Sequence, residues 1–235
     1  MPRHETLNNV SHKDLKINTT RSEKFGDNIM SSKIYPIEFR QVQAHYPIFF
    51  FREQNSVFPV ALFGFEQGEN LFLGENGWDA GYLPLLVERQ PFLIGRGQSR
   101  DQAESLVLNI DLDHPRVNTE AGESIFLPSG GNSDYIEKIA AMLQAVNQEE
   151  ESLPSFTHAL EEQGLLEPCF LDIELDSGAQ HRLSGFLTIN EEKVAQLPGQ
   201  VAAEFHERGW MAAIYMCLAS HSQIRELIRR KQARV

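Results

Sequence analysis

Short apolar blocks alternate with polar segments through the first half of the chain. The apolar runs 47–52 and 57–65 are rich in Phe, Val and Ile, and they flank the polar segment 53–56. Two such runs around a short polar segment predict a β-hairpin. Near-continuous apolar strands are typical of a buried position in a layered core. We therefore expect this hairpin and a third strand at 70–74 to form a central antiparallel meander.

Five more runs have the pattern of strands, and one of them is predicted to be an edge strand because it contains Pro36. These runs are residues 33–40, 91–95, 105–110 and the pair 167–175 and 181–189. A polar turn at 95–101 should join the second and third runs. The last pair alternates apolar and polar residues around the turn 176–180, which predicts a second hairpin.

Helical periodicity begins near Asp134 and continues through much of the second half. Five apolar residues share one face of the first predicted helix: Ile136, Ile139, Ala140, Leu143 and Val146. Ser133 or Asp134 is suited to cap its N-terminus. The charged link 149–151 should end this helix. A second short helix should then occupy 152–163 and stop at Gly164.

Shorter helical patterns complete the set, at residues 78–87, 190–197, 201–208, 210–218 and 222–234. Strands and helices are segregated along the chain, which favours an α+β fold over a doubly wound parallel sheet. We expect antiparallel sheets from the N-terminal half and a C-terminal hairpin, covered mostly by C-terminal helices. The expected organisation is a polar N-terminal arm, 1–31, and a single domain, 32–235. A sub-boundary within the acidic loop 111–133 is the alternative.

The composition narrows the compartment and the partners. A net charge of −12 over 235 residues disfavours binding to nucleic acid or to an anionic membrane. Cys169 and Cys217 lie in apolar surroundings without a C-x-x-C motif, which indicates core residues in a reducing compartment. Residues 1–20 lack the apolar core of a secretory signal, and no run approaches the roughly 18 apolar residues of a membrane span. We expect a cytoplasmic protein.

Nine short segments carry a resemblance to a known family. They are 12–17 (HKDLKI), 46–50 (YPIFF), 58–64 (FPVALFG), 68–72 (GENLF), 78–84 (WDAGYLP), 90–92 (QPF), 164–168 (GLLEP), 183–186 (LSGF) and 189–193 (INEEK). In order and spacing they resemble the SapC family of bacterial proteins along nearly the whole chain. The family takes its name from a surface-layer gene region, so the resemblance implies a surface-layer association.

The resemblance also implies genetic neighbours. Members of the family tend to be encoded beside flavin-dependent halogenase-like proteins, 2-oxoglutarate-oxygenase-like proteins and TonB-dependent receptors. It supplies no catalytic residues that can be transferred to this sequence.

The aromatic-rich stretch 44–91 contains the first candidate site. Trp78, Asp79 and Tyr82 combine two amphipathic rings with a carboxylate just after a glycine-containing turn. Such rings offer apolar area with a polar group, which suits a pocket for a peptide or an aromatic ligand. His45 and Tyr46, from the same stretch, complete the predicted ligand-binding set. The alternative is structural: Asp79 caps a short helix while both rings pack on the sheet.

The second candidate site follows the predicted strand 105–110. Asp111, Asp113 and His114 place two carboxylates and an imidazole at a strand end, and these groups suit a divalent cation. Pro115 follows directly, and the spacing matches no familiar set of ligands. The alternative is therefore a solvated acidic loop.

Recognisable catalytic motifs are missing from the sequence. Gly95 and Gly97 begin a dinucleotide-like pattern that has Arg100 in place of the third glycine, and neither Ser184 nor Ser220 lies in a G-x-S-x-G elbow. We predict no cofactor and no catalytic residue. The favoured function is a non-enzymatic accessory protein that binds a peptide or a partner protein, with homo-oligomerisation as an option. The alternatives are a metal-dependent enzyme, or an accessory to halogenase- or oxygenase-type enzymes, and a surface-layer structural protein.

Overall fold

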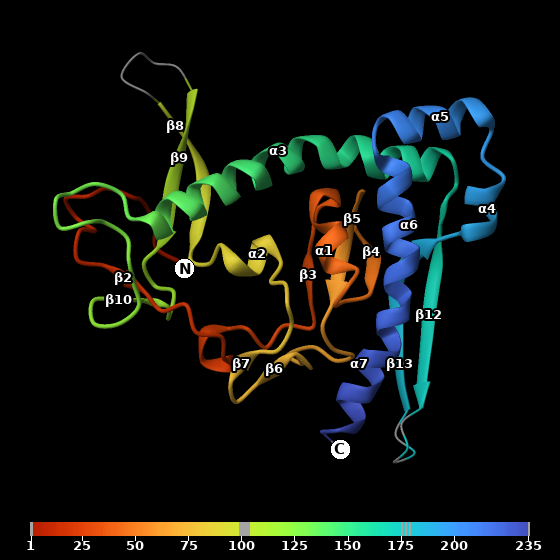
Figure 1. Cartoon of the computed structure of the whole chain (residues 1–235), viewed down its shortest axis with the longest axis horizontal. Coiled ribbons are helices and arrows are strands. Elements are labelled where there is room, and N and C mark those ends of the chain that lie inside the picture. Colours follow the sequence, from red (N-terminus) through yellow and green to blue (C-terminus); the bar gives the residue numbers. More distant parts are fainter. Residues whose placement is uncertain (1, 99–103, 175, 177, 179, 235) are drawn as a thin grey trace. The chain divides into compact units, whose positions relative to one another are not determined.

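The computed structural model (Figure 1) describes residues 2–98, 104–174, 176, 178 and 180–234. The chain divides into two compact units. Unit 1 comprises Met1–Asp27 and Leu85–Gln148, and unit 2 comprises Asn28–Pro84 and Glu149–Val235. The domain limits expected from the sequence, at residue 31 and within 111–133, stay predictions.

Unit 2 contains a five-stranded antiparallel sheet in the order β12-β13-β4-β5-β3. Its strands are β3 (Ser31–Lys33), β4 (Ile48–Glu53), β5 (Ser56–Leu62), β12 (Leu166–Glu174) and β13 (Gln180–Ile189). The hairpin of β4 and β5 is confirmed, with Phe50 opposite Pro59. The hairpin of β12 and β13 is confirmed as well. Of its predicted turn, Ser177 and Ala179 lie outside the described residues.

The predicted meander is wrong. The outer neighbour of β5 is β3, which precedes the hairpin in sequence, and 70–74 contributes no strand to this sheet. Instead β6 (Leu73–Gly74) pairs with β7 (Gly77–Trp78) in a separate two-stranded ribbon. The predicted strand 33–40 is also mostly helical, because Pro36 begins the 3-10 helix η2 (Pro36–Glu38) and α1 (Phe39–Val42) follows.

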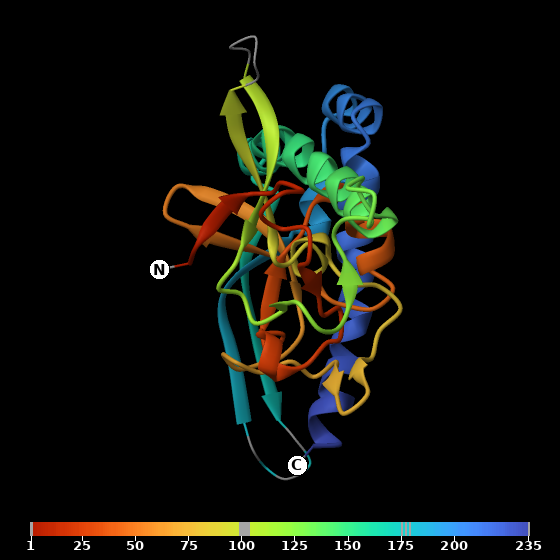
Figure 2. The same cartoon turned by 90° about the vertical axis from the view of Figure 1, so that its left-hand side faces the viewer.

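Helices of unit 2 follow the C-terminal hairpin. They are α4 (Glu191–Ala195), α5 (Gly199–Glu207), α6 (Trp210–Ser220), η3 (His221–Gln223) and α7 (Ile224–Gln232). Asn190 caps α4 as predicted, since its side chain accepts a hydrogen bond of 2.9 Å from Lys193 N. The long α6 packs against β4 and β13, and Figure 2 shows it beside the sheet. The buried residues of this core include Phe49, Phe50 and Ile214.

A single 29-residue helix, α3 (Asp134–Glu162), replaces the two helices predicted between 134 and 163. Its residues to Gln148 belong to unit 1 and those from Glu149 belong to unit 2. Glutamate is a good helix former, so the charged link 149–151 continues the helix. Pro154 lies inside the helix, where it removes one backbone donor. Gly164 adopts φ +63° just after the end, as its predicted C′ position requires.

Unit 1 contains two three-stranded sheets, β1-β9-β8 and β10-β2-β11, and the short helix α2 (Leu85–Glu88). The strands are β1 (His4–Thr6), β2 (Lys16–Ile17), β8 (Phe92–Gln98), β9 (Glu104–Asp111), β10 (Val117–Asn118) and β11 (Glu123–Ser124). The predicted strands 91–95 and 105–110 are confirmed as parts of β8 and β9, which pair antiparallel. Of the predicted turn 95–101, residues 95–98 extend β8 and 99–101 lie outside the described residues.

The predicted helix at 78–87 is confirmed only for Leu85–Glu88. Pro84 precedes α2, which fits proline's preference for helix starts, while Trp78 is part of β7. The predicted apolar face of α3 lies in the core of unit 1, where Ile136, Ile139 and Leu143 pack with Ile17. Ala140 is exposed instead.

The α+β fold class is confirmed, with antiparallel sheets and helices mostly in the C-terminal half. Within the described residues, every helix is too short or too polar to cross a lipid bilayer.

Candidate functional site

The structure brings the predicted ligand-binding residues of unit 2 together through a chain of hydrogen bonds. Trp78 Nε1 donates to Tyr46 Oη at 2.7 Å, and Tyr46 Oη donates to the carbonyl oxygen of Tyr82 at 2.5 Å. Tyr82 Oη in turn donates to Glu38 Oε1 at 3.0 Å. Because Tyr46 is buried, the pKa of its phenol is raised. The polar groups of Trp78 and Tyr46 therefore already have partners inside the protein.

Apolar contacts hold the same rings in place. The ring of Tyr46 meets Phe63 and Phe72 edge-on, with centroids 5.1 and 4.7 Å apart. Trp78, which is half-buried, meets Phe63 at 5.1 Å with an interplanar angle of 81°. Edge-to-face geometry is favourable for aromatic pairs. These contacts place Tyr46 and Trp78 against neighbouring aromatic rings; ligand binding here stays a prediction.

The two other residues of this predicted set also have partners. Asp79 does not cap α2, which begins at Leu85, and its exposed carboxylate instead pairs with Arg230 Nη1 at 2.9 Å. The Arg230 guanidinium lies over the Phe72 ring, 4.5 Å from its centroid. The ring of His45 lies against Gly81, where an added Cβ would approach it to 2.9 Å.

The predicted metal ligands lie in the turn after β9, in unit 1. Asp111 Oδ1 accepts from Asp113 N at 3.1 Å and from Arg3 N at 3.2 Å. His114 Nδ1 accepts from Arg116 N at 3.2 Å. Burial is the main cause that lowers the pKa of His114, and the nearby Arg116 charge lowers it further.

This turn uses its carboxylate and imidazole atoms to order its own backbone. Within residues 2–98, 104–174, 176, 178 and 180–234, no group of three or more His, Cys, Asp or Glu side chains is placed to hold a metal ion. The metal site stays a prediction.

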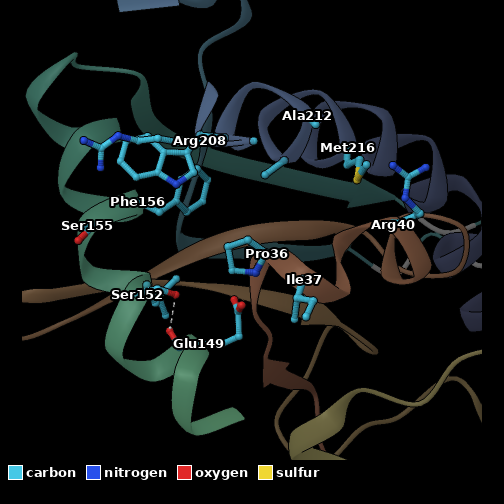
Figure 3. A pocket seen from close by; sticks show the side chains of 14 residues that line it. Pro36, Ile37, Arg40, Glu149, Ser152, Ser155, Phe156, Arg208, Ala212 and Met216 are labelled. Carbon is cyan, nitrogen blue, oxygen red and sulfur yellow. Dashed lines mark hydrogen bonds between the residues drawn. The ribbon is translucent and has the colours of Figure 1, made fainter. Parts of the chain in front are cut away.

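A cleft of about 590 Å³ in unit 2 was not anticipated from the sequence. Three segments form it: η2 with α1, the α3 residues from Glu149 to Phe156, and the start of α6 (Figure 3). Its lining consists of Pro36, Ile37, Arg40, Glu149, Ser152, Leu153, Ser155, Phe156, Arg208, Gly209, Trp210, Ala212, Ala213 and Met216. The buried Phe156, Leu153 and Ala213 form an apolar floor.

Local sequence explains the α6 wall of the cleft. Gly209 adopts φ +73°, a left-handed conformation that suits glycine, and it separates α5 from α6. This turn places Arg208 next to Trp210, with the guanidinium 4.7 Å from the indole centroid. Trp210 also packs against Phe156 and Phe205, at centroid distances of 5.9 and 5.4 Å. Trp210 is thereby fixed as part of the wall.

Two arginines and one glutamate provide the charges of the lining. Arg40 and Arg208 lie toward opposite ends of the drawn lining, with Pro36 and Ile37 between them (Figure 3). Burial raises the pKa of the Glu149 carboxyl, and a hydrogen bond with the Ile37 backbone partly offsets this effect. The pKa of the Glu149 carboxyl is therefore higher than that of a solvated glutamate.

Sequence reasoning missed the cleft because its residues come from three distant segments and form no motif. A local signal was nevertheless present at Arg208-Gly209-Trp210, where a helix-ending glycine separates a cation from a large aromatic ring. Ile37 was a second signal, since it follows Pro36, and a proline inside an apolar run weakens the prediction of a strand.

Neither a protein of curated function nor a solved structure matches the chain. A sequence profile described as SapC matches residues 7–227 of the 235-residue chain, as the resemblance predicts. The match spans both units, and the chain belongs to the SapC family.

Proposed function

We propose that this protein is a non-enzymatic binding protein, and that the cleft of unit 2 holds a peptide segment of a partner protein. The observation that carries the proposal is an apolar floor beside Ile37, a large aliphatic side chain that is 60% exposed. Exposed apolar groups gathered in a concave surface are typical of interaction sites. Trp210 supports the proposal, because tryptophan is enriched among residues that dominate binding energy.

The site has the composition expected for peptide recognition. Phe156, Trp210 and Met216 offer apolar contact, while Ser152 and Ser155 expose hydroxyl groups on the α3 wall. Hydroxyl groups can serve the backbone donors and acceptors of an extended peptide. Ser152 Oγ donates to the Glu149 carbonyl at 3.2 Å and retains acceptor capacity. The cleft is therefore suited to one large side chain and the polar backbone on either side of it.

The test is selection of a displayed random peptide library on the purified chain. The recovered peptides are then measured by fluorescence anisotropy against wild type and against an Ile37→Gln variant. Removing one aliphatic contact should weaken binding about tenfold. Because Ile37 is exposed, the variant should fold normally, and thermal melting checks this.

Phe170→Gln is the matched control, because Phe170 is also 60% exposed but lies on β12 outside the cleft. The proposal requires peptides that lose affinity in Ile37→Gln and keep it in Phe170→Gln. Peptides that bind both variants as tightly as wild type, or a library that yields no binder, would contradict it.

A further inference from the structure

The charges of the cleft restrict which peptide it accepts. The chain carries a net charge of −12, yet two of the three charged side chains among the described lining residues are arginines. Within the described part of the chain, Arg40 has no ion-pair partner, and it is exposed on α1. An unpaired cation beside an apolar floor provides electrostatic complementarity for an anionic ligand.

The opposite end of the cleft adds a second site of positive potential. Arg208 is exposed and stacks on Trp210. It also forms an exposed ion pair with Glu204 at 3.0 Å, and such surface pairs contribute little to the free energy of folding. The first turn of α6 lines the same end, and no side chain caps its N-terminus. Guanidinium groups and free backbone N–H donors at a helix start both favour a carboxylate.

The third charge does not oppose this assignment. The Glu149 carboxyl bonds with the Ile37 backbone and has a raised pKa because of burial. Its negative charge is thus directed at a backbone donor of the cleft wall. The anionic groups of a ligand would contact the arginine ends, and the apolar group would lie between them, over Phe156 and beside Ile37.

We infer that the occupant is an extended acidic segment of another protein, in which an aspartate or glutamate lies next to a large apolar residue. The carboxylate binds Arg208 or Arg40, and the apolar side chain enters the cleft between them. This inference rests on the proposed function of the same cleft, and it adds the chemical class of the partner segment.

The probes are the peptides recovered from the displayed library, synthesised with acetylated and amidated ends so that only side chains carry charge. Each is compared with a version in which Asp or Glu is replaced by Asn or Gln. We expect acidic residues beside a large apolar residue to be enriched. Loss of the carboxylate should weaken binding to wild type about tenfold, as expected for a charge-assisted hydrogen bond.

The protein variants are Arg40→Gln, Arg208→Gln and the double variant, with Arg225→Gln as the control. Arg225 is an exposed arginine of α7 outside the cleft, so the control makes the same change in net charge as each single variant. The double variant should bind each acidic peptide and its neutral version with nearly equal affinity. Arg225→Gln should retain the difference of about tenfold.

The outcomes separate this inference from the proposed function. Peptides that depend on Ile37 but lack acidic residues, or that lose nothing in the double arginine variant, would overturn the inference and leave the peptide-binding function intact. A library without any Ile37-dependent binder would overturn both.

Discussion

Replacing Asp27 by Asn should destabilise unit 1 strongly, because it leaves a buried guanidinium without its counter-charge. Arg116 and Asp27 are 0% and 1% exposed. Arg116 Nη2 donates to both carboxylate oxygens of Asp27, at 2.7 and 2.6 Å. Removing one partner of a buried ion pair typically costs about 3–5 kcal/mol.

The remaining contacts of Arg116 place the expected loss near the lower end of that range. Its Nη1 still donates to the carbonyl oxygens of Asn18 and Thr20, at 2.9 and 2.6 Å. An amide oxygen at position 27 can also accept one of the two lost hydrogen bonds. We therefore expect the free energy of unfolding to fall by about 3 kcal/mol at neutral pH.

The assay is urea unfolding followed by circular dichroism, together with hydrogen exchange of peptides that cover β2 and β10. Exchange is needed because two units need not unfold in one step. Arg182→Gln is the control, since its pair with Asp172 spans 3.5 Å and both side chains are mostly exposed. The Arg182→Gln substitution should lower the free energy of unfolding by less than about 1 kcal/mol. An Asp27→Asn variant within about 1 kcal/mol of wild type would show that this buried ion pair does not stabilise unit 1.

Two further changes probe the junction of α6 and β4 in unit 2. Ser220→Ala should lower the free energy of unfolding, measured in urea, by about 1–3 kcal/mol. Ser220 Oγ accepts a hydrogen bond from the buried Ile48 N at 2.8 Å, and alanine leaves that donor unsatisfied. A neutral effect would mean that the donor finds another partner. Burial lowers the pKa of His221, whose ring stacks on Phe49, so the folded state favours the neutral imidazole. Its contribution to stability is full above the ordinary pKa of 6.5 and declines as the pH falls below it. The free energy of unfolding of wild type, measured relative to that of His221→Phe, should therefore fall from pH 7 to pH 5. A difference that does not change with pH would contradict the assignment.

The two hairpins of unit 2 could be predicted from the sequence, because neighbouring residues determine both strands and the turn between them. The runs around 53–56 form the β4–β5 hairpin, and the alternation around 176–180 marks β12 and β13, because each pattern reports both the strand and its nearest partner. The sheet order could not be predicted in the same way. Pairing of β13 with β4 joins Phe186 to Phe51 across the chain, and β3 takes the edge next to β5. Such pairings depend on packing between distant segments.

The predicted helix end at 149–151 was wrong. The charged link 149–151 suggested an end to a helix, yet glutamates are compatible with an exposed helical surface, and α3 continues to Glu162. The predicted aromatic set did converge on one place, since Tyr46, Trp78 and Tyr82 share a hydrogen-bonded network. The cleft could not be predicted, because no pattern links Ile37 to Trp210 before the fold is known.

The most direct test of the binding function is hydrogen exchange on the complete chain with and without a library-selected peptide. We expect slower exchange in the peptide-bound state at the three cleft segments: η2 with α1, the 149–156 part of α3, and the start of α6. Exchange in β12, which carries the control residue Phe170, should not change. Protection centred on Trp78 and Tyr82, or no protection at the cleft, would show that the cleft is not the peptide-binding site.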